Sequence, residues 1–257
     1  MPTFKPSLAL ACAAFGAGAA AAAGPVCKAE SQPTLTPVIE LYTSEGCSSC
    51  PPADRWLATL KPVAASGRAV VQAFHVGYWD YIGWKDIYAD PRNTERQKAF
   101  ALVTNARSVY TPQVIVAGTD FRAWSSERAF EDAVKAVNAR KATASVEITP
   151  RLLADGSVEG NVSSASAEKA HLTLVVALAQ DGIVSKPNAG ENKGETLAQN
   201  FVVRDVAEFR GTGTIAGSFR FTPKGNWHPD RMAVVAYVQD PSKGHVLQAL
   251  SAPVCRQ

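Results

Sequence analysis

Two cysteines, Cys47 and Cys50, constrain this chain more than any other feature, because the local sequence pattern changes where they stand. The segment before them, Pro37–Thr43, is rich in Val, Ile, Leu and Tyr and predicts a buried strand. Pro51 and Pro52 follow them and suit the first turn of a helix. Apolar residues then recur at the spacing of one helix face, at Ala53, Trp56, Leu57 and Leu60.

Three kinds of site could use this pair. A Cys-x-x-Cys motif at a strand-to-helix junction is typical of a thioredoxin-like redox centre. The helix N-terminus would stabilise a Cys47 thiolate, the attacking species in disulfide exchange, and Cys50 would resolve the mixed disulfide. A structural disulfide in a non-enzymatic binding module is the second interpretation. A metal site is the third, with copper(I) bound by the two thiolates and His75. Glu45 could raise the pKa of the thiol by like-charge repulsion, but we expect it to face water.

The first half of the chain continues with alternating strands and helices. We expect a strand at Arg68–Val76, a helix opened by Asp90-Pro91, and a strand introduced by Thr111-Pro112. A last helix begins at Ser125 or Ser126. The order of these elements predicts an α/β thioredoxin-like domain over residues 37–141.

Five residues outside the cysteine pair are candidates for the same site. In a thioredoxin-like fold a cis-proline loop packs beside the redox pair and receives an extended substrate chain. Thr111 and Pro112 stand at that place, and Trp79 is a candidate for the substrate-facing wall. His75 and Asp80 are candidates for tuning the Cys47 thiolate. Two alternatives stay open, a hydrogen-bonded strand end for His75 and loop packing for Trp79.

The composition changes near residue 142, where short strands between turn signals replace helical patterns. This pattern predicts an all-β antiparallel sandwich domain over residues 142–257. The expected strands are Ala144–Thr149, Val158–Val162, His171–Gln180, Leu197–Val206, Gly213–Thr222, Met232–Gln239 and Val246–Ala249.

The N-terminus carries the pattern of a secretory signal peptide over residues 1–23, and residues 24–36 follow as an irregular lead-in. Four cysteines then remain in an oxidising compartment, where disulfides persist. They allow three connectivities. The close pair most naturally bonds to itself, which leaves a structural disulfide between Cys27 and Cys255. Two free terminal thiols are the alternative.

Charge and hydropathy exclude other classes of partner. The 257 residues carry a formal net charge of +3, without an arginine or lysine block or a basic-aromatic stripe, so nucleic-acid binding is not expected. Eighteen consecutive apolar residues do not occur after the leader, so we expect no stable membrane insertion once the leader is removed.

Four motifs carry a resemblance to a known family: "ELYTSEGCSSCPPAD", "FHVGYWDYIGWKD", "YTPQVIV" and "GENKGETLAQNFVVR". Together they resemble a family of exported bacterial thioredoxin-like proteins catalogued as domain of unknown function 1223. The resemblance covers most of the mature chain. It implies a thioredoxin-like domain followed by a β-rich domain, and it supplies no substrate.

The sequence therefore predicts a periplasmic or secreted thiol-disulfide oxidoreductase. Cys47 would be the nucleophile and Cys50 the resolving thiol. Its partners would be protein or peptide thiols and a redox partner protein. We expect no dissociable cofactor and no metal, because the dithiol itself carries two electrons. The motif does not indicate the direction of electron flow.

Overall fold

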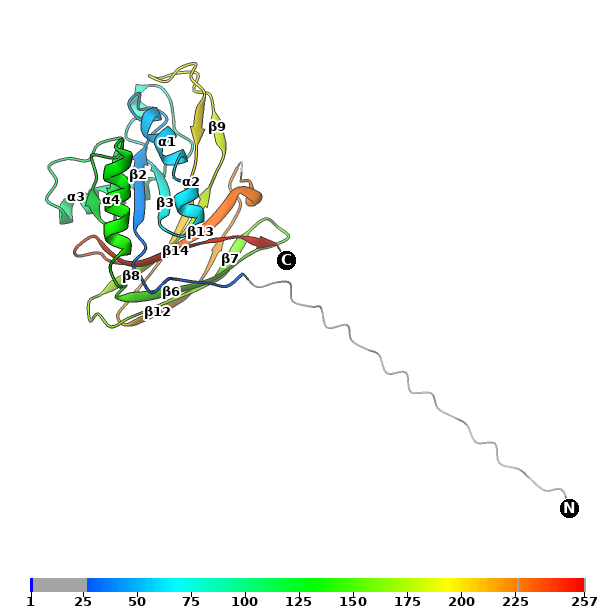
Figure 1. Cartoon of the computed structure of the whole chain (residues 1–257). Coiled ribbons are helices and arrows are strands. Elements are labelled where there is room, and N and C mark those ends of the chain that lie inside the picture. The colour runs from blue at the N-terminus through cyan, green and yellow to red at the C-terminus, as the bar shows by residue number, and fades with distance from the viewer. Residues whose placement is uncertain (2–26, 226, 257) are drawn as a thin grey trace.

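A computed structural model describes residue 1, residues 27–225 and residues 227–256 of the chain (Figure 1). The predicted leader lies outside the described residues apart from Met1. No helix in the described ranges is long and apolar enough to cross a lipid bilayer. The helices are α1 (Pro51–Ala58), α2 (Lys61–Ala65), α3 (Pro91–Val103) and α4 (Glu127–Asn138), with 3-10 turns at Asp80–Ile82 and Pro229–Arg231.

The central element is an eight-stranded sheet to which both halves of the chain contribute, in the order β14-β13-β8-β11-β3-β2-β4-β5. The two halves meet where β11 pairs with β3 in parallel, Val202 opposite Ala73. The strands from the first half are β2 (Val38–Thr43), β3 (Val70–His75), β4 (Gln113–Val116) and β5 (Thr119–Asp120). Those from the second half are β8 (Leu172–Gln180), β11 (Val202–Gly211), β13 (Met232–Asp240) and β14 (His245–Pro253).

A second, five-stranded sheet packs against the β8–β13–β14 part of the first (Figure 1). The core between the sheets includes Ile148, Val162, Leu174 and Val234, all at most 2% exposed. The strands of this sheet are β1 (Ala29–Glu30), β6 (Ala144–Leu152), β7 (Val158–Ser166), β12 (Thr214–Phe221) and β15 (Cys255–Arg256).

Helices cover both faces of the strands from the first half. Alternate residues of a strand point to opposite faces. Leu41 of β2 accordingly packs with Leu57 of α1 and Val134 of α4, whereas Tyr42 packs with Phe100 of α3. This alternation separates two environments on the two sides of β2, and each contains a polar cluster described below.

The predicted bond between Cys27 and Cys255 is confirmed, with 5.8 Å between the Cα atoms. The adjoining strands explain how the two ends of the described chain meet. β1 pairs antiparallel with β6, and β15 pairs parallel with β6. The disulfide therefore joins two short strands that share one neighbour.

Several predicted strands are too short, for example Val158–Val162 against β7, and the lead-in predicted as irregular contains β1. One predicted strand is divided in two. The segment expected as Leu197–Val206 is divided into β10 (Leu197–Gln199) and β11, and β10 pairs instead with β9 (Ile183–Ser185). Phe201 separates the two strands with a left-handed φ of 56°. The β-rich pattern of Leu197–Val206 does not reveal a single left-handed residue at Phe201. The excursion formed by β9, residues 186–196 and β10 carries the second half of the chain to the cysteine pair.

The tight turn at Gly118 provides a test of how the two halves pack. Gly118 has a φ of +80°, and a Cβ there would overlap the carbonyl oxygen of Gly244 in the β13–β14 turn. We expect Gly118→Ala to lower the free energy of unfolding in urea by about 3 kcal/mol, from backbone strain plus overlap. Gly213 is the control, because its φ is +68° with open space around it, and Gly213→Ala should cost only about 1 kcal/mol. Equal losses would contradict the packing.

Candidate functional site

The cysteine pair forms a disulfide at the start of α1, as predicted. Cys50 is the N-cap residue of α1, and Pro51 and Pro52 occupy its first turn. The Cys47 N–H donates to the Ser44 carbonyl at 3.2 Å, and the Cys50 N–H donates to the Cys47 carbonyl at 3.1 Å. Cys47 is 1% exposed and Cys50 is fully buried. An attacking sulfur can therefore reach the disulfide only after part of its surroundings moves.

The structure brings the predicted substrate-binding residues to the same region. The Trp79 indole N–H donates to the Thr111 hydroxyl at 2.6 Å, and the Thr111-Pro112 peptide bond is cis. Trp79 also packs against the loop that carries the cysteines, because a Cβ on Gly46 would lie only 3.1 Å from its Cβ. These contacts join Trp79, Thr111 and the cysteine loop into one surface.

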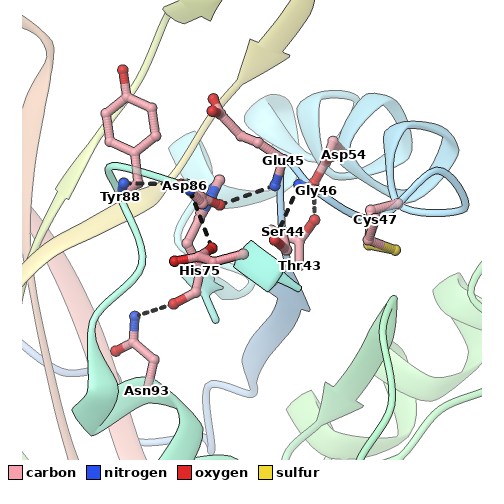
Figure 2. A network of polar contacts seen from close by, with 12 residues as sticks. Thr43, Ser44, Glu45, Gly46, Cys47, Asp54, His75, Asp86, Tyr88 and Asn93 are labelled. Atoms are coloured by element: carbon pink, nitrogen blue, oxygen red, sulfur yellow. Dashed lines mark hydrogen bonds and ion pairs between the residues drawn. A yellow bond between two sulfur atoms is a disulfide. The ribbon is translucent and has the colours of Figure 1, made fainter. Parts of the chain in front are cut away.

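A group of buried ionisable side chains lies behind this surface, and we call it the acid cluster: Glu45, Asp54, Asp86 and His75 (Figure 2). His75 Nδ1 lies 2.7 Å from Asp86 Oδ2. Asp86 also accepts hydrogen bonds from the backbone N–H groups of Glu45 and Tyr88, each at 2.9 Å. The Asp86 carboxylate therefore ties the end of β3 to the cysteine loop.

Asp54 is the member of the acid cluster next to the disulfide. It follows Cys50 by one helical turn, and its N–H donates to the Cys50 carbonyl at 3.1 Å. Side chains lean toward the N-terminus of a helix, which directs the Asp54 carboxyl toward Cys50. The Thr43 hydroxyl donates to Asp54 Oδ1 at 2.8 Å. Burial raises the pKa of Asp54 to about 7, so both of its protonation states are populated near neutral pH.

The other members of the acid cluster influence one another. Burial, followed by the charge of Asp86, raises the pKa of Glu45. Burial opposes the charged form of His75, but the carboxylates of Asp86, Asp54 and Glu45 outweigh it and raise the pKa of His75. Burial likewise opposes ionisation of Asp86, yet the charge and hydrogen bond of His75 lower its pKa. The balance favours a His75–Asp86 ion pair beside two carboxyl groups that hold protons more tightly than usual.

Residues 186–196, which connect β9 to β10, lie over the cysteine loop, and we call them the strap. The Asn192 side-chain amide donates to the carbonyl oxygens of Glu45 and Cys47 at 2.8 and 3.1 Å. The Ser48 N–H donates to the Glu191 carboxylate at 3.0 Å. The strap thus holds the cysteine loop from the second half of the chain.

The predicted site residues have separate roles in this geometry. His75 lies in the acid cluster, and Asp80 lies beside it, where it accepts a hydrogen bond from the Asp86 N–H at 3.2 Å. The expectation that Glu45 faces water is wrong, because Glu45 is 1% exposed and the Trp84 indole N–H donates to its carboxylate at 2.8 Å. In the described part of the chain, His, Cys, Asp and Glu do not gather in a group that could hold a metal ion.

Sequence reasoning missed Asp54 and the strap. The spacing of Asp54 from Cys50, together with the buried positions Ala53 and Leu57 beside it, could have indicated a carboxyl on the buried face of the helix. No signal in the sequence indicated that Asn192 contacts a loop 145 residues earlier.

The raised pKa of Asp54 predicts a pH-dependent stability difference. Its folded-state pKa of about 7 lies above its ordinary 3.8, so its favourable contribution is complete below about pH 4 and is lost as the pH rises to about 7. Asp54→Asn keeps an acceptor for Thr43 and cannot ionise. In urea unfolding, the variant should gain stability relative to the parent between pH 5 and pH 8. A difference between the two proteins that is the same at both pH values would contradict the assignment.

The contacts of Asn192 predict how readily the disulfide is reduced. Asn192→Ala removes the two hydrogen bonds that Asn192 donates to the cysteine loop and leaves the one at Glu191, and we expect reduction by dithiothreitol to become about tenfold faster. The exposed neighbour Lys193 supplies the control, and Lys193→Ala should leave the rate unchanged. If both variants are reduced at the parent rate, the strap does not limit access.

The sequence and the fold of this chain resemble those of known proteins. No curated protein matches the chain. A crystal structure of a protein from Agrobacterium tumefaciens aligns with a TM-score of 0.62 and 24% identity, covering 86% of this chain and 95% of that one, which is a likeness of fold alone. A domain of the outer membrane lipoprotein Omp28 from Porphyromonas gingivalis aligns with a TM-score of 0.27 and 12% identity, covering 45% of this chain and 91% of that domain. A family model described as a protein of unknown function, DUF1223, matches residues 38–239, and the chain therefore belongs to this family.

Proposed function

We propose that the protein is an exported thiol-disulfide oxidoreductase that acts on protein or peptide thiols through Cys47 and Cys50. The observation that carries the proposal is a disulfide at a strand-to-helix junction with a buried, partly protonated carboxyl one helical turn behind it. Ionisable groups with perturbed pKa values concentrate at functional sites. A disulfide that only stiffened a loop would not need the acid cluster.

The order of the elements supports a thioredoxin-like class for the first half. β2 and β3 are parallel and connected through α1 and α2, β4 is antiparallel to β2, and α4 follows β5. Trp79 and Thr111 border the cysteine loop, where an extended substrate chain would lie in such a fold. The division into domains at residue 142 remains a prediction, since strands from both ranges share one sheet.

The acid cluster supplies the proton transfer that thiol exchange requires. When Cys50 attacks a mixed disulfide it must first lose its proton. Asp54 is the nearest acceptor along α1, and a pKa of about 7 lets it both accept and release that proton near neutral pH. His75 Nε2 has no hydrogen-bond partner among the described residues, although the residue is fully buried. It is a second group through which a proton could leave.

The surroundings of the cysteines favour the reducing direction. A redox pair becomes a strong oxidant when its thiolate form is stabilised. Pro51 and Pro52 have no N–H to offer a thiolate, and the nearby carboxyl groups of Glu45 and Asp54 disfavour a negative charge. Both effects make the dithiol a better electron donor.

The proposed reaction transfers two electrons to a substrate disulfide. The Cys47 thiolate attacks one substrate sulfur, a mixed disulfide forms, and the first substrate thiolate leaves with a proton taken from solvent. Asp54 accepts the Cys50 proton, and Cys50 attacks Cys47 Sγ. This step expels the second substrate thiolate, which takes the proton from Asp54, and restores the Cys47–Cys50 disulfide. A dithiol partner protein then reduces that disulfide again.

The bonding of the cysteines agrees with an exported protein. Both Cys47–Cys50 and Cys27–Cys255 are bonded, and structural disulfides persist in oxidising compartments. The leader pattern of residues 1–23 supports the same proposal, with the periplasm or the medium as destination.

Reduction of insulin by dithiothreitol tests the activity. We expect the protein to accelerate the reaction and Cys47→Ser to abolish the acceleration, because the attacking thiolate is lost. The matched control removes the other disulfide through Cys27→Ser with Cys255→Ser, which should retain the activity of the folded protein. Acceleration that survives Cys47→Ser would exclude the mechanism.

The reduction potential separates this proposal from its alternative. The near-complete burial of Cys47 and Cys50 favours a binding module with a structural disulfide. Such a bond has a reduction potential below about −300 mV, whereas the potential of a reductant comparable to thioredoxin is about −270 mV. We expect the latter value. A potential of about −120 mV, typical of a strong oxidant, would reverse the proposed direction of electron flow.

A further inference from the structure

A cavity of about 970 Å³ lies between the two halves of the chain, on the α3 side of the eight-stranded sheet. Tyr42 and Phe74 line it from the first half, Val206 and Tyr237 line it from the second, and Phe100 lines it from α3. Ligand sites of small molecules commonly have volumes up to about 1,000 Å³ and occur where domains meet. The cavity therefore has the size and the position of a binding site.

The cavity is separate from the cysteine site. Tyr42 faces it from β2, whereas the next residue, Thr43, points to the other face and donates to Asp54. Neither cysteine lines the cavity. A ligand here would not contact the disulfide.

A charged group is fixed at the base of the cavity. Arg96 Nη2 lies 2.5 Å from Glu40 Oε1 and 3.1 Å from Gln239 Oε1, and the Tyr42 hydroxyl donates to Glu40 Oε2 at 2.9 Å. The guanidinium group stacks between two rings, 5.3 Å from the centroid of Phe74 and 5.4 Å from that of Tyr237. These contacts satisfy both oxygens of Glu40 and hold Arg96 in place.

Two hydrogen-bond donors at this base remain without a partner. Arg96 Nε and the Tyr237 hydroxyl have none among the described residues, although Tyr237 is fully buried. Burial raises the pKa of Tyr237, so its hydroxyl keeps its proton. An unsatisfied buried donor costs roughly 1–3 kcal/mol, so such groups need an explanation. Since both side chains line one cavity and contact each other, a single acceptor group could serve both.

We propose that this cavity binds an organic carboxylate with an apolar body. The unpartnered groups are donors, and a carboxylate is an acceptor without donors of its own. Arg96 is already paired with Glu40, and its Nε–H remains as a donor that belongs to a charged group, which strengthens a hydrogen bond to an acceptor. Apolar side chains, among them Phe100, Val103, Ile115 and Val246, form one part of the lining and suit an aliphatic or aromatic body. Charged side chains, among them Arg92, Glu95, Glu208 and Arg210, form another part. The proposal is independent of the thiol chemistry at Cys47.

Titration calorimetry with decanoate, below its micelle concentration, tests the proposal. We expect one saturable site, and no binding of decylamine, which has the same chain with a cationic head. Tyr237→Phe should weaken decanoate binding about tenfold or more, because one hydrogen bond to the carboxylate is lost. The same variant should unfold in urea at no lower concentration than the parent, since it removes a hydroxyl without a partner.

Two further variants and one control sharpen the result. Ala99 is exposed and lines the cavity, so Ala99→Trp should block decanoate without loss of stability. Tyr110 lies outside the cavity, where its hydroxyl donates to Asp120 at 2.7 Å, and Tyr110→Phe should bind decanoate as the parent does. Cys47→Ser should do the same, which keeps this test distinct from that of the redox function. Equal binding of decanoate and decylamine, or parental affinity in Tyr237→Phe, would overturn the proposal.

Discussion

Burial of β8 on both of its faces is the constraint on which the rest of the structure depends. Every residue of Leu172–Gln180 is buried, because one face completes the core against the five-stranded sheet and the other faces the first half of the chain. A strand covered on both sides is typically a near-continuous apolar run, and Thr173 and Gln180 are the polar residues within this one. Because β8 lies next to β11, and β11 next to β3, the two halves are joined through the backbone as well as through side chains. The strap and the cavity both follow from that junction.

The cysteine site combines two opposing influences. A helix N-terminus favours a thiolate, whereas two prolines and several carboxyl groups disfavour one. Because the acid cluster is buried, small changes in the distances between its groups should shift their pKa values, since charges interact strongly where water is excluded. The strap adds a contact from the second half of the chain, because Asn192 donates two hydrogen bonds to the cysteine loop.

Much of this arrangement could be predicted from local patterns, and the remainder depends on long-range contacts. The strand before Cys47, the helix after Cys50 and both disulfides followed from spacing and from the number of cysteines. The burial of Glu45 did not, because it depends on Trp84 and on a backbone contact with Asp86. The division of one predicted strand at Phe201 was also hidden, since the side chain of Phe201 gives no sign of a left-handed backbone. Patterns report which face of an element is buried, but not which distant segment covers it.

The most direct measurement of the central claim is the capture of a covalent intermediate. If Cys47 attacks and Cys50 resolves, Cys50→Ser incubated in its reduced form with a peptide disulfide should accumulate a mixed disulfide through Cys47, detectable by mass spectrometry. Cys47→Ser should not accumulate such an adduct, because Cys50 is fully buried at the N-cap of α1. We expect an adduct on Cys47 only. Absence of any adduct, or equal adducts on both cysteines, would contradict it.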